Sequence, residues 1–423
     1  MAVPEQTSSS ETRPIKQIGE TELIWLMAML MALQAFGIDA MLPALDEMAA
    51  ALSVPGNDRQ YVIGVYLLTA GLGALVPGAL ADRFGRRPVL LSAIGIYITL
   101  AIACALVTTF EQLIAVRAAA GFFAAGIVAL PPAIIRDRVG GDKMAKMMSL
   151  IFVIFLMVPA IAPSIGELIL KVGDWRLIFL AMAVQGTIIG SWVYFRLPES
   201  LSPENRQPII PTTIARNMAT ALSDRSIIGY VIGSTLVFGA LFGFINSSQQ
   251  LIGEGFGRPD LFPVVFGICA GSMAIASWSN SRIVERFGAR RVSHTAVFAF
   301  IAVAAVQVFM AFSHEETLWE FVPLMAINMA LLGFIGSNFG SIAMTPFFHI
   351  AGAASSVQTF VRITTAALLG AVIGQAFDGT ARPLALALLG SGIACLLLVL
   401  FSEKGRLFAP PKAQNRYPSA MRS

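Results

Sequence analysis

The segment Asp82-Arg83-Phe84-Gly85-Arg86-Arg87 returns later in the chain as Glu285-Arg286-Phe287-Gly288-Ala289-Arg290-Arg291. The two copies lie 203 residues apart, which is close to half of the 423-residue chain. Each copy follows a long apolar run and interrupts it with charge, so each is predicted to be a short loop between two helices. The repeat therefore indicates a chain built from two similar halves.

The composition places these halves in a membrane. Hydrophobic residues make up 56% of the chain and charged residues 13%, about half the roughly 25% charge of ordinary globular proteins. A membrane-spanning helix needs about 20 apolar residues, and twelve such helices would account for nearly the whole hydrophobic fraction. The sequence predicts an all-α integral membrane protein with twelve transmembrane helices. Their expected positions are 23–45, 60–80, 89–109, 111–134, 147–170, 176–196, 227–251, 261–280, 294–313, 318–341, 356–378 and 383–402.

The longest polar interruption, from Pro198 to Arg225, comes after the sixth predicted span. Six spans separate the two repeat copies, so both copies face the same side of the membrane. The halves are therefore expected to be parallel repeats about an axis along the membrane normal, an arrangement found in secondary transporters. The predicted divisions are a tail at 1–22, a six-helix bundle at 23–196, a central loop at 197–226, a second six-helix bundle at 227–402 and a tail at 403–423.

The basic residues predict the orientation. Of the 29 lysines and arginines, 22 fall in segments on the side of the N-terminus, 5 on the other side, and 2 within spans. Because basic loops stay in the cytoplasm, we expect both termini there and a multi-pass protein of the inner (plasma) membrane. This bias accounts for the net charge of +4 without a nucleic-acid partner. We expect a monomer whose partners are the bilayer, protons and a small-molecule substrate.

No pattern for covalent chemistry or metal binding is visible. The cysteines Cys104, Cys269 and Cys395 lie far apart in apolar runs, without the spacing of a disulfide framework or a metal site. The sequence also contains no phosphate-cradling loop and no nucleophile constellation. We therefore expect no enzyme, no ATP-driven pump and no cofactor, with a proton gradient as the energy source.

Two charges lie well inside predicted spans, Asp39 in the first and Arg117 in the fourth. Each lies about six residues from the same face, which at 1.5 Å per residue is about 9 Å deep, so the two could pair. An intramembrane charge costs about 2.5–3.5 kcal/mol and usually marks a functional site. Asp39 is then a proton carrier whose proton affinity depends on its distance from Arg117. The alternative is a static ion pair that fixes helix packing.

Other polar groups in the spans have two readings each. Arg362 either contacts substrate or the inner gate, or it reaches a lipid headgroup by snorkelling. Glu167, near the end of the fifth span, is expected to be a solvated rim residue, with an added proton or cation site as the alternative. The amide side chains of the spans either line the substrate cavity or form hydrogen bonds between helices. Met41 is a further candidate for the cavity wall. The possible cavity residues are Gln34, Met41, Asn246, Gln249, Asn338, Gln358 and Arg362.

The first repeat copy has an electrostatic requirement. Asp82 is expected at the C-terminal end of a helix, where the helix dipole disfavours a carboxylate. It needs compensation from the loop arginines or from the N-terminus of another helix. A contact made in one conformation only would act as a gate; the alternative is an ordinary cytoplasmic loop. The expected gating residues are Gly78, Asp82, Arg83, Gly85, Arg86, Arg87, Glu285, Arg286 and Gly288.

These motifs resemble a known family. The stretch from Gly78 to Arg87 looks like the signature loop between spans two and three of the major facilitator superfamily. The spacing of Leu113, Arg117 and Gly121 is similar to its span-four pattern, with Ala120 in place of a polar residue. Asp39-Ala40-Met41-Leu42-Pro43 resembles the span-one motif of Bcr/CflA-type drug:proton antiporters, with Met41 replacing tyrosine. The segments Arg136-Asp137 and Asp174 to Phe179 also look like that branch.

The resemblance implies roles for the matching residues. In the family the span-one acid and the span-four arginine take part in proton coupling, which implies this role for Asp39 and Arg117. The signature loop controls opening. The antiporter motif of span five is present in altered form, with Ala162 and Glu167 in place of glycines. Its retained or aligned kink residues are Ala162, Pro163 and Gly166.

The sequence leaves two functions open. One is a secondary active transporter that exports small amphipathic, drug-like compounds in exchange for protons by alternating access. The other is a proton symporter or facilitator that imports a small, possibly anionic metabolite, with Arg117 and Arg362 holding the anion. A non-transporting receptor would need an accessory soluble domain, and the short tails provide none.

Overall fold

The computed structural model describes residues 18–139, 141–206, 225–314, 316–345 and 351–408, with a few single positions between 207 and 224. The predicted N-terminal and C-terminal tails lie largely outside these described residues, as does most of 207–224 in the predicted central loop. Within the described part every regular element is a helix. The all-α fold class is thereby confirmed.

The helices follow one another with short connections. The first part of the chain contains α1 (Glu20–Asp39), η1 (Leu42–Ala44), α2 (Leu45–Ala51), η2 (Gly56–Gln60), α3 (Tyr61–Gly73), α4 (Pro77–Phe84), α5 (Arg86–Leu106), α6 (Phe110–Arg138), α7 (Gly141–Leu170), α8 (Arg176–Arg196) and η3 (Pro203–Asn205). The second part contains α10 (Arg225–Gln250), η4 (Leu251–Gly255), η5 (Pro259–Leu261), α11 (Phe262–Phe287), α12 (Ala289–Ser313), α13 (Leu318–Met344), α14 (Ala351–Gln375) and α15 (Arg382–Ser402).

Most of these helices can cross a membrane. Ten described helical stretches are long and apolar enough, and an eleventh span is possible if the bent pair Gly56–Gly73 and Pro77–Phe84 counts as one. α7 adds the shorter apolar stretch Met157–Leu170. The protein is therefore a multi-pass membrane protein, and twelve remains the predicted number of spans.

The second predicted span, at 60–80, differs from a single straight helix. α3 ends at Gly73, α4 begins at Pro77, and the two axes differ by 46°. Proline has no N–H to donate and its ring collides with the carbonyl four residues earlier, so Pro77 starts a new helix. The first candidate span runs over Glu20–Ala51, and within it α1 ends at Asp39 and is followed by a short 3-10 turn that contains Pro43.

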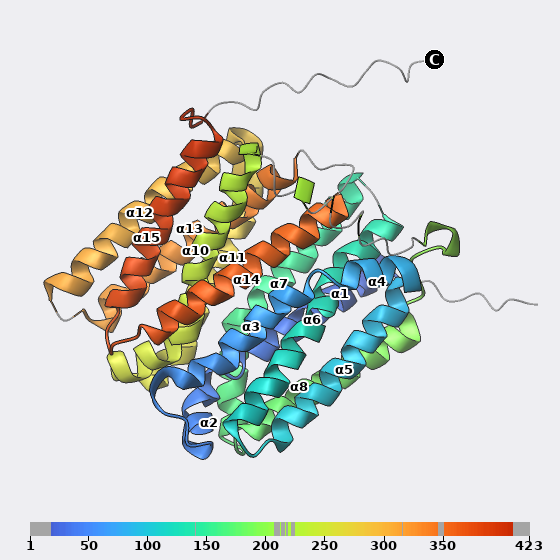
Figure 1. The fold of residues 1–423 in the computed structure, drawn as a ribbon, viewed down its shortest axis with the longest axis horizontal. Coiled ribbons are helices and arrows are strands. Elements are labelled where there is room, and N and C mark those ends of the chain that lie inside the picture. Colours follow the sequence, from blue (N-terminus) through green and yellow to red (C-terminus); the bar gives the residue numbers. More distant parts are fainter. Residues whose placement is uncertain are drawn as a thin grey trace, which may run out of the picture.

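The helices form two groups (Figure 1). In the first, which we call the N-terminal group, α6 packs against α1, α3 and α5, and α8 packs against α5. In the second, the C-terminal group, α10 packs against α14 and α15, and α13 packs against α11 and α12. The groups meet along two helix pairs, α3 with α14 and α7 with α11.

The helix bundle has two ends, which we call the terminal end and the far end. The terminal end is where α1 begins and α8 ends, joined by the ion pair of Glu22 with Arg196 at 2.6 Å. The far end is where α1, α10 and α14 finish, and where η2 lies. α4 ends at the terminal end, since Arg87 bonds the Tyr194 carbonyl near the end of α8.

The sequence repeat corresponds to a structural repeat. Gly85 separates α4 from α5 with φ of 104°, and Gly288 separates α11 from α12 with φ of 81°. Both angles lie where a side chain would be strained, so both positions need glycine. In each copy the chain therefore leaves one helix and starts the next without an intervening loop.

Candidate functional site

Asp39 is the last residue of α1 and is 4% exposed. No hydrogen bond or ion pair joins its carboxylate to another described residue. The chain turns immediately after it, through Ala40 and Met41, both fully buried. The structure thus places a lone carboxyl group inside the bundle, at the break between α1 and η1.

Arg117, in α6, is completely buried. Its Nε donates a hydrogen bond to the Val62 carbonyl at 3.2 Å, but its two terminal nitrogens have no partner among the described residues. The guanidinium carbon lies 4.0 Å from the ring centroid of Tyr66 and 6.0 Å from that of Phe179. Such cation–π contacts contribute about 2 kcal/mol when desolvated, which is less than the cost of burying an unpaired charge.

The two predicted partners do not form an ion pair in this conformation of the described chain, although α1 and α6 pack together. Tyr66 lies beside Arg117 and close to α1. Its ring lies under Arg117, and a Cβ at Gly37, two residues before Asp39, would be 3.6 Å from its hydroxyl. That hydroxyl has no hydrogen-bond partner in the described part. Tyr66 was missed in the sequence, where nothing distinguishes it from other aromatic residues of the spans.

Glycines allow the close packing around these two charges. A side chain at Gly121 would overlap the Tyr66 carbonyl, so α6 can approach α3 only with glycine there. A side chain at Gly166 would overlap the carbonyl of Ala40, so α7 can reach the turn after Asp39. Ala162 is buried nearby on α7, which continues through Pro163 without ending. Glu167 lies at the rim, paired with Lys171 at 3.3 Å and partly exposed.

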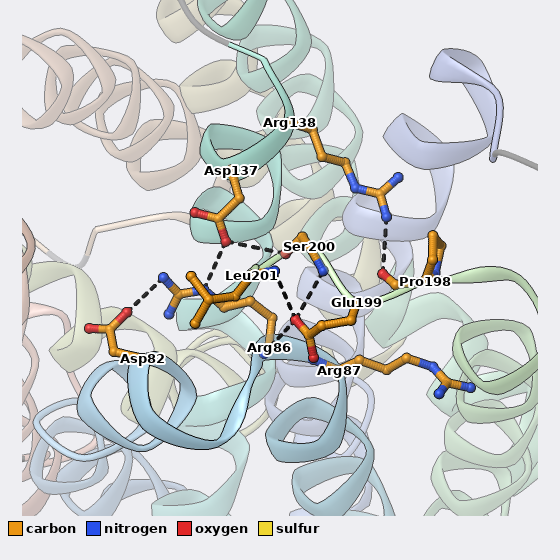
Figure 2. A network of polar contacts seen from close by, with 9 residues as sticks. All are labelled: Asp82, Arg86, Arg87, Asp137, Arg138, Pro198, Glu199, Ser200 and Leu201. Carbon is orange, nitrogen blue, oxygen red and sulfur yellow. Dashed lines mark hydrogen bonds and ion pairs between the residues drawn. The ribbon is translucent and has the colours of Figure 1, made fainter. Parts of the chain in front are cut away.

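At the terminal end, Arg86 is the centre of a polar cluster that Figure 2 shows. It is 3% exposed and pairs with Asp82 at 2.7 Å and with Asp137 at 3.0 Å. Asp82 therefore receives its compensation from a loop arginine, one of the two sources expected. A buried guanidinium held by two carboxylates is a well-defined contact that fixes α4, α5 and α6 relative to one another. We call this cluster, with Arg87, Arg138 and Pro198–Leu201, the terminal-end network.

Glu199 completes the terminal-end network (Figure 2). Its carboxylate accepts hydrogen bonds from the backbone N–H groups of Arg86, at 2.9 Å, and Arg87, at 3.2 Å, which are the first two residues of α5. It also accepts from Ser200 and Leu201. α5 has no side-chain cap of its own, since Gly85 precedes it. Glu199 thus supplies the N-cap and complements the helix dipole from a distant segment.

Replacing Glu199 with glutamine should lower the thermal stability of the purified protein. The change removes the negative charge and one acceptor oxygen, and loss of a cap costs about 0.5–2 kcal/mol. For a protein of this size we expect the melting temperature to fall by about 1–4 °C. Glu204→Gln is the matched control, because Glu204 is exposed. Equal melting temperatures for the two variants would contradict the capping role.

The second repeat copy is arranged differently. Arg286 lies against the ring of Phe287 at 5.5 Å, and Glu285 forms no ion pair with a described residue. Arg290 instead pairs with Glu403 at 3.0 Å, just after α15. Glu403 also accepts from the Tyr230 hydroxyl at 2.5 Å. The two groups thus share one arrangement. An acid after the last helix, Glu199 or Glu403, binds the start of the helix that follows the repeat glycine, which is α5 or α12.

At the far end, a set of polar side chains joins the two groups. Arg59 pairs with Asp46 in its own group and with Glu254 across the interface. Asn57 donates to the carbonyls of Gln375 and Phe377, both at 3.1 Å. We call this set the far-end bridge. It consists of Asp46, Asn57, Arg59, Gln60, Gln249, Gln250, Glu254 and Gln375.

The predicted cavity residues divide among several environments. Gln249 belongs to the far-end bridge, Asn338 exchanges hydrogen bonds with Asn280, and Met41 is packed in the core. Asn246 is buried with neither amide atom bonded to a described residue, and Gln34 is partly buried. Of the seven, only Gln358 and Arg362 line a described cavity.

A larger cavity, of about 630 Å³, opens at the far end of the C-terminal group between η4 and the start of α13. Glu316 lies in its wall, and burial raises the pKa of this carboxyl to about 7. Neither of its oxygens has a partner among the described residues. The cavity contains neither Asp39 nor Arg117, so it is separate from the buried charges.

An all-helical, multi-pass fold with buried charges inside its helices and polar networks at both ends is typical of membrane transporters. Residues 24–368 match the Major Facilitator Superfamily, and the chain belongs to this family. The fold class predicted from the repeat is therefore confirmed.

Two relatives indicate which branch of the family the chain resembles. The chain is 28% identical over 362 residues to the bicyclomycin resistance protein homolog of Haemophilus influenzae, covering 85% of this chain and 91% of the relative. It is 30% identical over 387 residues to multidrug resistance protein MdtL of Escherichia coli O127:H6, covering 89% and 94%. These similarities confirm the resemblance to Bcr/CflA-type drug-efflux transporters.

Solved structures agree on the fold. A D-xylose-proton symporter superposes with a TM-score of 0.69 at 16% identity, covering 93% of this chain and 98% of the other. The human organic anion transporter MFSD10 gives 0.66 at 17% identity, covering 91% and 100%. At these identities the likeness shows the fold alone.

Proposed function

We propose that the chain exports small amphipathic compounds in exchange for protons by alternating access. The observation that carries the proposal is the pair of buried, mutually unpaired charges, Asp39 and Arg117, with the Tyr66 ring against Arg117. A lone buried carboxyl group holds a proton readily, and an approaching guanidinium expels it. A conformational change that brings the Arg117 side chain toward Asp39, or takes it away, would therefore release or bind a proton.

The lack of pairing also argues against the static alternative. A pair kept only for packing would satisfy the terminal nitrogens of Arg117, because removing one partner of a buried ion pair costs about 3–5 kcal/mol. Here these nitrogens have no described partner. The unpaired guanidinium of Arg117 is costly in this conformation, which is consistent with its gaining a partner in another conformation. A coupled transporter requires such a change.

The polar networks at the two ends would have different roles in gating. We propose that the terminal end faces the cytoplasm, as the distribution of basic residues predicts, with both termini inside and the far end outside. The far-end bridge would then be a closed outer gate, and its contacts between groups must break to admit protons. The terminal-end network would hold α4 and α5 rigid as the inner gate moves.

The names of the relatives support export. One is described as a bicyclomycin resistance protein homolog and another as a multidrug resistance protein, and resistance of this kind is consistent with outward transport of a drug. We propose a monomer in the inner membrane that uses the proton gradient directly.

A second candidate is a symporter that imports an anionic metabolite. Arg362 favours it, because this arginine lines a cavity without forming an ion pair to a described residue. Arg117 could hold a second anionic group. Both candidates use the same fold and differ in the relative direction of proton and substrate.

A susceptibility screen tests the proposal. The chain would be expressed in an efflux-deficient bacterial strain and challenged with cationic, neutral and anionic compounds. We expect protection against at least one compound, lost when a protonophore collapses the gradient. Increased sensitivity, together with greater cellular accumulation, would instead favour the importer.

A further inference from the structure

A small cavity lies within the C-terminal group, between α10, α13 and α14. Its volume is about 160 Å³, room for about five waters or one compact polar group at roughly 30 Å³ per water. Val231, Phe339 and Ala343 form its apolar part, while α14 contributes the polar side chains. Ser355 is exposed, so the cavity is open on its side.

Arg362 supplies the charge of this cavity. Its guanidinium carbon lies 5.3 Å from the ring centroid of Phe238, and the side chain forms no ion pair or hydrogen bond with a described residue. No carboxylate is among the residues that line the cavity. By contrast, Arg59 and Arg86 each hold two carboxylates. Arg362 therefore presents its five N–H donors without an internal acceptor.

Neighbouring side chains add hydrogen-bond donors on the same helix face. Ser355, Thr359 and Arg362 follow one another at spacings of four and three residues, which places them on one side of α14. The Ser355 and Thr359 hydroxyls form no hydrogen bond with a described residue, whereas Ser234 across the cavity donates to the Val231 carbonyl. The polar wall thus offers donors and one positive charge, and it offers no competing anion.

We propose that this cavity is an anion subsite, which binds the carboxylate or sulfonate group of a transported amphipathic compound. A planar guanidinium matches such groups with two parallel hydrogen bonds, and the hydroxyls provide further donors. The apolar wall receives the part of the molecule next to the anion. The inference rests on the proposed function as a transporter, but it holds for either direction of transport.

Two xanthene dyes of opposite charge provide the test. Binding of fluorescein, an anion, and of rhodamine 6G, a cation, would be measured by fluorescence anisotropy on the purified full chain. We expect Arg362→Gln to raise the Kd of fluorescein at least about tenfold, the loss of one charge-assisted pair, and to leave that of rhodamine 6G unchanged. Arg362→Lys keeps the charge but loses the paired hydrogen bonds, so its Kd for fluorescein should lie between those of the unsubstituted chain and Arg362→Gln. Thr359→Val should lose part of the affinity.

Controls distinguish the possible failures. Arg258→Gln removes an exposed far-end arginine of the same charge and should leave the fluorescein Kd unchanged. Equal losses for both dyes, no loss in Arg362→Gln, or no fluorescein binding by the unsubstituted chain would overturn the subsite. If anionic phosphatidylglycerol, but not phosphatidylcholine, displaces fluorescein, the occupant is a lipid headgroup and the substrate proposal fails. An Asp39→Asn variant that transports normally would refute proton coupling alone, because the binding assay needs no gradient.

Discussion

Replacing Asp39 with asparagine should reduce proton-driven efflux to the level of vesicles without the protein, while substrate binding stays measurable. Asparagine keeps the size and polarity of the side chain but can neither bind nor release a proton. Because Asp39 is buried and has no described partner, its replacement should leave the packing of α1 unchanged. The measurement is uptake of a substrate, identified by the susceptibility screen, into inverted vesicles with an acidic lumen.

Asp378→Asn is the matched control for this variant. Asp378 is also an aspartate of the described chain, but it is exposed and bonds only locally, to Thr380 at 2.6 Å. The Asp378→Asn variant should therefore retain efflux. Undiminished efflux in Asp39→Asn would remove Asp39 from the mechanism.

A disulfide between the two groups near the far end should stop transport completely and reversibly. A Cβ at Gly64 in α3 would lie 3.7 Å from the Cβ of Ala371 in α14, and the usual Cβ separation in a disulfide is about 3.8 Å. Gly64→Cys with Ala371→Cys, in a chain whose three cysteines are replaced, should therefore cross-link on oxidation. Alternating access requires these ends to separate, so the oxidised form should be inactive and a reductant should restore it.

A second cross-link, within one group, controls for oxidation itself. A Cβ at Gly126 in α6 would lie 3.3 Å from the Cβ of Ala93 in α5, and both helices belong to the N-terminal group. This cross-link should leave transport intact, since the helices of a group move together. Transport that continues in the fully oxidised Gly64–Ala371 variant would show that these ends do not separate.

Much of the fold could be predicted from the sequence. Apolar runs identify the helices, and Phe110 with Glu111 marks the tight hairpin between α5 and α6. In the structure Thr109 accepts a hydrogen bond there from the Gln112 N–H at 3.3 Å. The repeat predicts that Gly85 and Gly288 lie between helices, and both have positive φ values in the structure. These features are local, so a short stretch of sequence determines them. The break between α3 and α4 was missed, although Pro77 is a local signal for it.

The site was less predictable. Depth along a helix placed Asp39 and Arg117 at one level, but it does not give the direction in which each side chain points. That direction depends on packing against other helices, as in the contact of Arg117 with the Tyr66 ring of α3. The roles of Tyr66 in the pair remain predictions, as does proton coupling itself.

The polar networks were harder still. In the sequence Arg59 is one basic residue of an outer loop, and its partner Glu254 lies 195 positions away. Glu199 and Asp137 likewise lie far along the chain from Arg86. Contacts of this kind depend on how complete helices pack, and no pattern in a short segment reports them.

Proton movement during transport tests the central claim most directly. Proteoliposomes would be loaded with the pH-sensitive dye pyranine, and substrate would be added outside without an imposed gradient. Exchange predicts that the lumen becomes alkaline as substrate enters and protons leave, in either orientation of the protein, and that Asp39→Asn abolishes the signal. Acidification of the lumen would show symport, and substrate entry with no change in pH would show uncoupled transport; either result would contradict the account.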